Sequence, residues 1–185
     1  MRWKVVSLCF WVAAVVAVGA HMARYAATPG PTPQAPLAAA SGTVTLYLHP
    51  KCACSRASVQ EFLRLLPSLR GQRIRVVYHD QGKGADWAKS DLWAAFEGVS
   101  GVERVLDPGG RQTRADGVRT SGHVLTYGPD RRLLFSGGIT ASRGHVGPSP
   151  GGELLKRLAQ GSRRPASVAT FGCDFDKPAH KDAPR

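Results

Sequence analysis

Residues 43–66 read TVTLYLHPKCACSRASVQEFLRLL and decide the fold class of the chain. Residues 43–49 are rich in β-branched, aromatic and leucine side chains, which predicts a strand. In residues 59–66 the apolar side chains recur at the spacing of one helix face, which predicts a helix. Two cysteines, Cys52 and Cys54, lie between these elements. The stretch is therefore a strand, a cysteine-containing turn and a helix.

The rest of the chain supplies further strands and helices around this unit. Glycine and proline turn signals separate β-type runs from amphipathic segments. The expected elements are a strand at 73–79, a helix between 86 and 98, a strand at 102–106, a hairpin of 123–127 and 131–139, and a helix that starts at Pro150 and stops at Gly161. This order predicts an α/β domain of thioredoxin-like fold, with a central mixed sheet flanked by helices.

Composition divides the chain into four segments. We expect a signal anchor or signal peptide at 1–25, an Ala/Pro-rich flexible linker at 26–42, the thioredoxin-like domain at 43–161, and a C-terminal tail at 162–185 that carries Cys173. Aromatic residues flank Cys173 in the sequence FGCDF, within an otherwise polar segment. This aromatic island predicts that the tail docks back on the domain.

The N-terminal segment predicts export. Val5–Ala20 contains sixteen residues without a charge or a proline, and Arg2 and Lys4 precede it. This length lies between a signal-peptide core, about 7–15 residues, and a membrane span of about 20. We favour an uncleaved single-pass anchor, and the alternative is a product secreted after signal cleavage. The basic N-terminus places the domain outside the cytoplasm.

The composition excludes several function classes. The 185 residues include 25 Lys and Arg against 13 Asp and Glu, a formal net charge of +12. These basic residues are scattered, and no zinc-finger or RNA-binding signature accompanies them, so we expect no nucleic-acid partner. The sequence contains no phosphate-binding or dinucleotide-binding loop and no paired carboxylates of a hydrolase.

The Cys52-Ala53-Cys54 turn is the main candidate for chemistry. The N-terminus of the following helix, together with Lys51 and Arg56, favours a thiolate, which is the nucleophilic form of cysteine. A disulfide across one intervening residue closes a very small ring, which predicts a labile bond rather than a structural one. The turn therefore predicts a redox-active pair.

Four blocks of sequence resemble a known family: HPKCACSRAS, TSGHVLTYGPDRRLLFSGGIT, SRGH and the late FGC. Together, over about residues 44–174, they resemble the RedB-like proteins, membrane-tethered thioredoxin-like proteins of some Gram-negative bacteria. The resemblance implies a C-x-C site, a thiol-redox role, and an inner-membrane protein whose domain lies in the periplasm. It also implies that Cys52 and Cys54 form the site pair, and that Ser121, Gly122 and His123 face them across the sheet.

One feature departs from the wider thioredoxin pattern. That fold normally has a cis-proline just before the first strand of the hairpin, whereas this chain has Thr120-Ser121-Gly122-His123 there. Without the proline, His123 can instead point its ring at the thiols. Two thiols with imidazoles suit Cu(I) or Zn(II). The candidate metal ligands are Cys52, Cys54, His123, His145 and Cys173.

These observations lead to one main prediction and two alternatives. The main prediction is a thiol–disulfide oxidoreductase that needs no cofactor, in which Cys52 attacks and Cys54 or Cys173 resolves the mixed disulfide. Its partner is an envelope thiol protein or another redox protein. The first alternative is a copper- or zinc-binding delivery module, and the second is a protein-interaction domain with a vestigial site. Cys173 can resolve a mixed disulfide, complete a metal site or pair with another chain.

Overall fold

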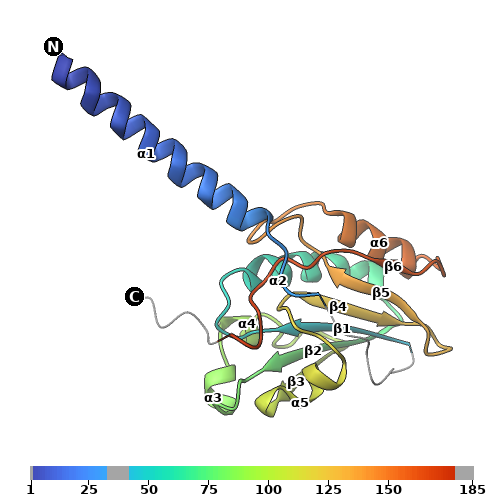
Figure 1. Cartoon of the computed structure of the whole chain (residues 1–185). Coiled ribbons are helices and arrows are strands. Elements are labelled where there is room, and N and C mark those ends of the chain that lie inside the picture. Colours follow the sequence, from blue (N-terminus) through green and yellow to red (C-terminus); the bar gives the residue numbers. More distant parts are fainter. Residues whose placement is uncertain (1, 33–41, 178–185) are drawn as a thin grey trace.

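The computed structural model describes residues 2–32 and 42–177, and joins a long N-terminal helix to an α/β body (Figure 1). The helix, α1, spans Arg2–Ala27. Residues 33–41 of the predicted linker and residues 178–185 of the predicted tail lie outside the described residues.

The body is built on a six-stranded mixed sheet in the order β3-β2-β1-β4-β5-β6. β1 pairs in parallel with β2 and antiparallel with β4, so β1 lies in the middle of the sheet. The strands are β1 (Thr43–Leu48), β2 (Arg73–His79), β3 (Val102–Asp107), β4 (His123–Tyr127), β5 (Leu133–Gly138) and β6 (Ala166–Ser167). With the helices on its faces, this sheet confirms the predicted thioredoxin-like α/β class.

One face of the sheet carries the larger hydrophobic core. Its helical cover consists of α2 (Ser55–Leu65), η1 (Leu66–Leu69), α4 (Asp91–Ala94) and α6 (Pro150–Ala159). Phe62 of α2, Leu155 of α6 and Leu46 of β1 are fully buried in this core. The periodic apolar positions in the sequence therefore become the core-facing stripes of α2 and α6.

The opposite face has a smaller core, to which the tail contributes. Tyr47, Val77 and Leu125 of the sheet pack there with Val118 and with Phe175 of the tail. The short helices η2 (Pro108–Gly110) and α5 (Arg111–Ala115) precede Val118 in the chain.

The helix predicted between residues 86 and 98 is two short helices in the structure, α3 (Ala85–Ala88) and α4. Lys89 and Ser90 between them have extended backbone conformations. An extended residue interrupts the helical hydrogen bonds, and Ser90 begins a new helix as its N-cap residue.

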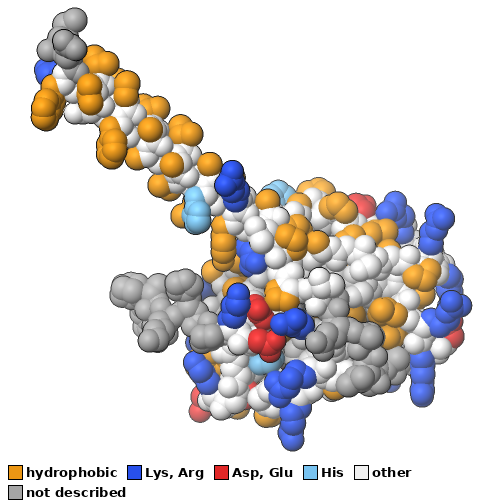
Figure 2. Space-filling model, viewed as in Figure 1, with side chains coloured by type: hydrophobic (Ala, Val, Ile, Leu, Met, Phe, Trp, Pro, Cys, Tyr) orange, Lys and Arg blue, Asp and Glu red, His pale blue; other side chains and the backbone are white. Residues whose placement is uncertain are grey.

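The N-terminal helix is long and apolar enough to cross a membrane over Trp3–Ala27. Its side chains are almost all exposed to the surroundings, and hydrophobic side chains cover the visible face of the helix (Figure 2). A signal sequence near an N-terminus has the same length and composition.

A three-cysteine candidate site

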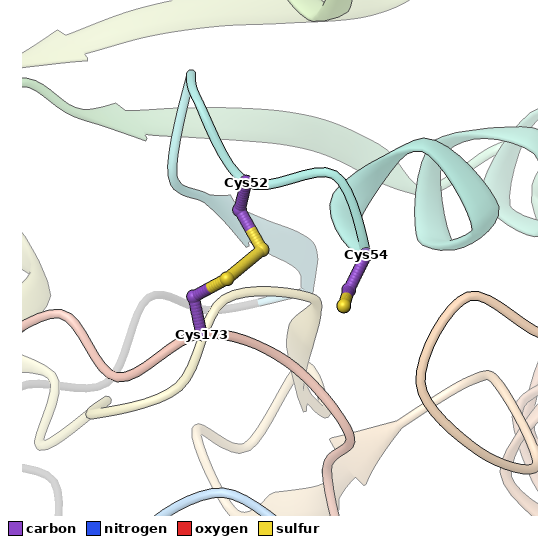
Figure 3. A group of neighbouring side chains, drawn as sticks. All are labelled: Cys52, Cys54 and Cys173. Atoms are coloured by element: carbon purple, nitrogen blue, oxygen red, sulfur yellow. A yellow bond between two sulfur atoms is a disulfide. The ribbon is translucent and has the colours of Figure 1, made fainter. Parts of the chain in front are cut away.

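The cysteine turn follows the end of β1, which is a central strand of the sheet. The tail brings a third cysteine to this turn. Cys52 and Cys173 form a disulfide with a Cα–Cα distance of 6.2 Å, although 121 positions separate them in the sequence. Cys54 is a free, half-buried cysteine and is the N-cap residue of α2. The three sulfur atoms all lie within 4.8 Å of one another (Figure 3). These residues, Cys52, Cys54 and Cys173, are called the cysteine site below.

Exposure differs among the three members of the cysteine site. Cys52 is only 3% exposed, whereas Cys54 and Cys173 are half-buried. An external thiol therefore has better access to Cys54 and Cys173 than to Cys52.

Backbone contacts hold the tail at the cysteine site. The Ser121 N–H donates to the Cys173 carbonyl oxygen at 2.9 Å, and the Phe175 N–H donates to the Arg119 carbonyl oxygen at 3.0 Å. A side chain at Gly172 would overlap the Ser121 carbonyl oxygen, so the tail approaches this loop as closely as glycine permits. The docking that the aromatic island predicts is present.

Ser121 connects three segments around the site. Its hydroxyl oxygen accepts from the His49 N–H at 2.7 Å and lies 2.6 Å from the Ser55 hydroxyl oxygen. Its own N–H bonds to Cys173. Ser121 is buried and so acts as a positioning residue for the end of β1, the start of α2 and the tail.

Gly122 occupies the place where the wider fold has a cis-proline. Its φ is +85°, and its N–H donates to the Tyr47 carbonyl oxygen at 2.7 Å. A Cβ at this position would lie 2.5 Å from the Ser58 hydroxyl oxygen. No cis peptide bond occurs among residues 2–32 and 42–177. The loop therefore approaches α2 through a left-handed glycine rather than through a proline.

The structure does not bring the two candidate histidines, His123 and His145, into the three-cysteine group. His123 is buried, and its ring nitrogens bond to the Thr170 hydroxyl at 2.7 Å and the Ser136 hydroxyl at 3.0 Å. His145 is exposed in a loop. In the described part of the chain, the one group with metal-ligand spacing consists of the three cysteines. The expected approach of the His123 ring to the thiols is therefore not observed.

The buried state of His123 predicts a pH-dependent stability. Burial lowers the pKa of His123 to about 4, whereas a histidine in an unfolded chain titrates near 6.5. The neutral form is the one that favours folding, so its contribution is complete above pH 6.5 and is lost as the pH falls toward 4. We expect a loss of about 3 kcal/mol in the free energy of unfolding from this residue.

Denaturant titrations of wild type and His123→Gln between pH 4 and pH 7 measure this effect. The glutamine can still bond to hydroxyl groups but does not take up a proton, so its stability should fall less steeply. The difference between the two curves isolates His123 from other groups. Parallel curves would contradict the assignment.

Two further histidines, His49 and His79, lie against the tail, and neither is among the candidate site residues predicted from the sequence. The Phe175 ring stacks on His79 with centroids 4.7 Å apart and lies 6.4 Å from the His49 ring. Burial is the largest cause of a lowered pKa at both histidines. The sequence does contain a signal for this pair, because His49 follows the predicted strand that becomes β1 and His79 ends the one that becomes β2. These two strands are parallel neighbours, so residues at their ends lie close together.

Comparisons with known proteins add information about the fold. No protein-family model and no curated protein matches the chain. A hypothetical protein from Sinorhizobium meliloti 1021 is similar in structure, with a TM-score of 0.57, 14% identity, and coverage of 82% of this chain and 97% of that one. An uncharacterized conserved protein from Geobacillus kaustophilus has a TM-score of 0.59, 15% identity, and coverage of 84% and 93%. At these identities the likeness establishes the fold alone.

Proposed function

We propose that the protein is a membrane-anchored, extracytoplasmic thiol–disulfide oxidoreductase, as the RedB-like resemblance implies. One observation carries the proposal: the free, half-buried Cys54 has its sulfur within 4.8 Å of both sulfurs of the Cys52–Cys173 disulfide. A thiolate close to a disulfide is the arrangement in which exchange occurs.

Exchange within the cysteine site needs no external reactant. When the Cys54 thiolate attacks the Cys52 sulfur, a Cys52–Cys54 disulfide forms, the existing disulfide breaks, and Cys173 leaves as a thiolate. Attack on the Cys173 sulfur forms Cys54–Cys173 instead and releases Cys52. Both rearrangements leave the cysteine site with one disulfide and one thiolate, so its oxidation state does not change. The C-x-C disulfide that the sequence predicts is then one of three isomeric oxidised forms.

Exchange with a partner changes the oxidation state of the cysteine site. A thiolate of a substrate dithiol attacks the half-buried Cys173 sulfur, and Cys52 leaves as a thiolate. The second substrate thiolate then displaces Cys173, so that the substrate gains a disulfide and the protein gains two thiols, with the substrate's protons going to these thiols or to solvent. The reverse sequence reduces a substrate disulfide.

The proposed location follows from α1. A span of 25 residues from Trp3 to Ala27 is apolar and exposed, and the basic residues Arg2 and Lys4 lie at its start. The positive-inside rule then favours an orientation with the body on the outer side of the membrane, and the RedB-like resemblance implies the inner membrane and the periplasm. Disulfide chemistry is compatible with that compartment, which is oxidising.

A second candidate function is binding of a soft metal ion by the reduced site. The observation that favours it is the mutual distance of at most 4.8 Å among the three sulfur atoms. Cu(I) and Zn(II) both bind thiolates. In this candidate Cys173 completes the ligand set in place of the histidines.

An experiment with the full-length protein in detergent micelles separates the two candidates. The oxidised protein is mixed with a reduced peptide that contains two cysteines, and we expect one peptide disulfide to form for each protein molecule. In parallel, the anaerobically reduced protein is titrated with Cu(I) and Zn(II). Stoichiometric metal binding that is lost in Cys52→Ser, with a peptide that stays reduced, would favour the second candidate. If neither reaction occurs, both candidates are wrong.

A further inference from the structure

We propose that the cysteine site works at the surface of the bilayer and exchanges disulfides with a thiol protein held in the same membrane. The inference rests on the proposed function, because it requires that α1 stays in the chain as a membrane span and that the cysteines exchange.

The end of α1 is bonded directly to the body. The Arg143 N–H donates to the Ala26 carbonyl oxygen at 3.0 Å, and the Arg143 Nε donates to the Thr28 carbonyl oxygen at 3.2 Å. The guanidinium group also lies over the Tyr25 ring, 5.0 Å from its centroid. The last turn of α1 and the residue that follows it therefore contact the body directly, without a flexible spacer between them.

The same contacts reach the cysteine site. A second nitrogen of the Arg143 guanidinium donates to the carbonyl oxygen of Gly172, the neighbour of Cys173. The Gly30 N–H donates to the Thr170 carbonyl oxygen at 2.8 Å, and the Thr120 hydroxyl donates to the Pro31 carbonyl oxygen at 3.0 Å. The Arg143 side chain thus bonds both to Thr28, just after α1, and to Gly172, the residue beside Cys173.

These contacts change the role of the predicted linker. A free tether over residues 26–42 would let the body move tens of ångströms from the membrane. In the structure α1 continues to Ala27, and residues 28–31 are bonded to the body. The remaining linker residues connect two points that both belong to the body, so their length does not separate the body from α1.

Helix length places this junction at the membrane surface. The 26 residues of α1 extend about 39 Å, because an α-helix rises about 1.5 Å per residue. The hydrocarbon core is about 30 Å thick, and the bilayer with its headgroups is about 40–45 Å thick. A span of this length therefore ends within the outer headgroup layer, and the body begins there.

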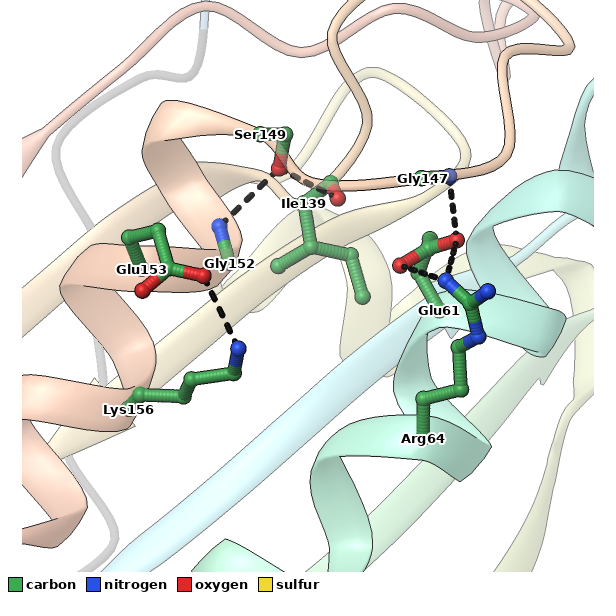
Figure 4. A network of polar contacts seen from close by, with 8 residues as sticks. All are labelled: Glu61, Arg64, Ile139, Gly147, Ser149, Gly152, Glu153 and Lys156. Atoms are coloured by element: carbon green, nitrogen blue, oxygen red, sulfur yellow. Dashed lines mark hydrogen bonds and ion pairs between the residues drawn. The ribbon is translucent and has the colours of Figure 1, made fainter.

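The loop that carries Arg143, residues 140–148, also presents an exposed apolar side chain. Val146 is 43% exposed, and among the residues that the structure describes it is the one large hydrophobic side chain outside α1 that is exposed. The loop is held firmly: the Glu61 carboxylate accepts from the Gly147 N–H at 2.5 Å, and the Ser149 hydroxyl donates to the Ile139 carbonyl oxygen at 2.7 Å (Figure 4). An exposed apolar side chain on a fixed loop that also bonds to the end of the membrane span is suited to contact lipid.

The position of the site defines the class of partner. A site fixed at the headgroup layer meets thiols that lie at the same level, whereas a soluble protein must approach the membrane surface to reach it. The favoured partner is therefore a membrane protein with a cysteine pair close to the outer surface of the bilayer. Confinement to one membrane raises the effective concentration of such a pair.

The test uses full-length protein in vesicles of phosphatidylethanolamine and phosphatidylglycerol. The probe is the two-cysteine peptide, either soluble or coupled to a phospholipid headgroup through a short linker. A spacer variant carries twenty Gly/Ser residues between Ala23 and Arg24, so that none of the residues that contact the body, from Tyr25 onward, is substituted. We expect the spacer to slow exchange with the lipid-coupled peptide by at least about tenfold and to leave exchange with the soluble peptide unchanged.

A second variant, Val146→Glu, tests the loop without altering a buried residue. It should also slow exchange with the lipid-coupled peptide, whereas Ser162→Glu, at an exposed position just after α6, should not. Equal rates for wild type and the spacer variant with the lipid-coupled peptide would overturn the inference. Failure of wild type to exchange with the soluble peptide would instead overturn the proposed function.

Discussion

A Cys52→Ser variant is expected to exchange disulfides with the soluble two-cysteine peptide at least about a hundredfold more slowly than wild type, because the disulfide that the peptide attacks, with Cys52 as its leaving group, is absent. Cys52 is bonded to Cys173 in the structure, and it is the sulfur that accepts attack when the C-x-C disulfide forms. Serine removes both pairings and changes the size of the side chain little. The measurement is the rate of peptide oxidation under anaerobic conditions.

Two matched variants define what this result means. Cys9→Ser alters an exposed cysteine on α1, far from the cysteine site in sequence, and should keep the wild-type rate. Cys54→Ser should keep the Cys52–Cys173 disulfide but lose rearrangement to the other isomers. A wild-type rate in Cys52→Ser would mean that the Cys54–Cys173 pair is sufficient and would contradict the role assigned to Cys52.

A Cys173→Ser variant is expected to lose about 5 kcal/mol of free energy of unfolding under oxidising conditions. The disulfide joins residues 121 positions apart, and a cross-link over a loop of that length removes a large conformational entropy from the unfolded chain. Release of the tail also exposes Phe175, which is 4% exposed in the structure. Denaturant unfolding of wild type and variant in the absence of a reductant measures the loss.

The same comparison under reducing conditions is the control. Reduction removes the cross-link from wild type, so the two proteins should then have nearly equal stability. A Cys54→Ser variant should resemble wild type in both conditions. Equal stability of wild type and Cys173→Ser without a reductant would show that the Cys52–Cys173 bond does not form in the folded protein.

The main architecture was predictable because local patterns determine it. The β-type run before Cys52 and the helical spacing after Cys54 became β1 and α2, and the hairpin of β4 and β5 lies where the pattern predicted it. Ser149 and Pro150 start α6, with the Ser149 hydroxyl accepting from the Gly152 N–H at 3.0 Å. These signals act over a few residues, so the sequence contains them directly.

The pairing of Cys52 with Cys173 was not predictable, because it depends on contacts between distant segments. Ser121 bonds to the Cys173 backbone, and Phe175 packs between histidines at the ends of β1 and β2. The aromatic island around Cys173 indicated docking but did not indicate the target. The brief edge strand β6 has only two residues, too few for a periodic signal.

His123 illustrates a different limit. Its residue type and its place opposite the cysteine turn were both compatible with a metal ligand. Its ring instead bonds to Ser136 and Thr170, which lie 13 and 47 positions away in the sequence. A histidine is available as a ligand only when its ring nitrogens are free, and that depends on partners that a single sequence does not identify.

A redox titration of the full-length protein, with the cysteine pairing mapped by mass spectrometry at each potential, tests the central claim most directly. The account predicts a reversible two-electron transition in the folded protein, with a peptide that links Cys52 to Cys173 and a free Cys54 on the oxidised side. If all three cysteines stay reduced at oxidising potentials, or if Cys52–Cys173 is reduced only when the protein unfolds, the account of the site is wrong.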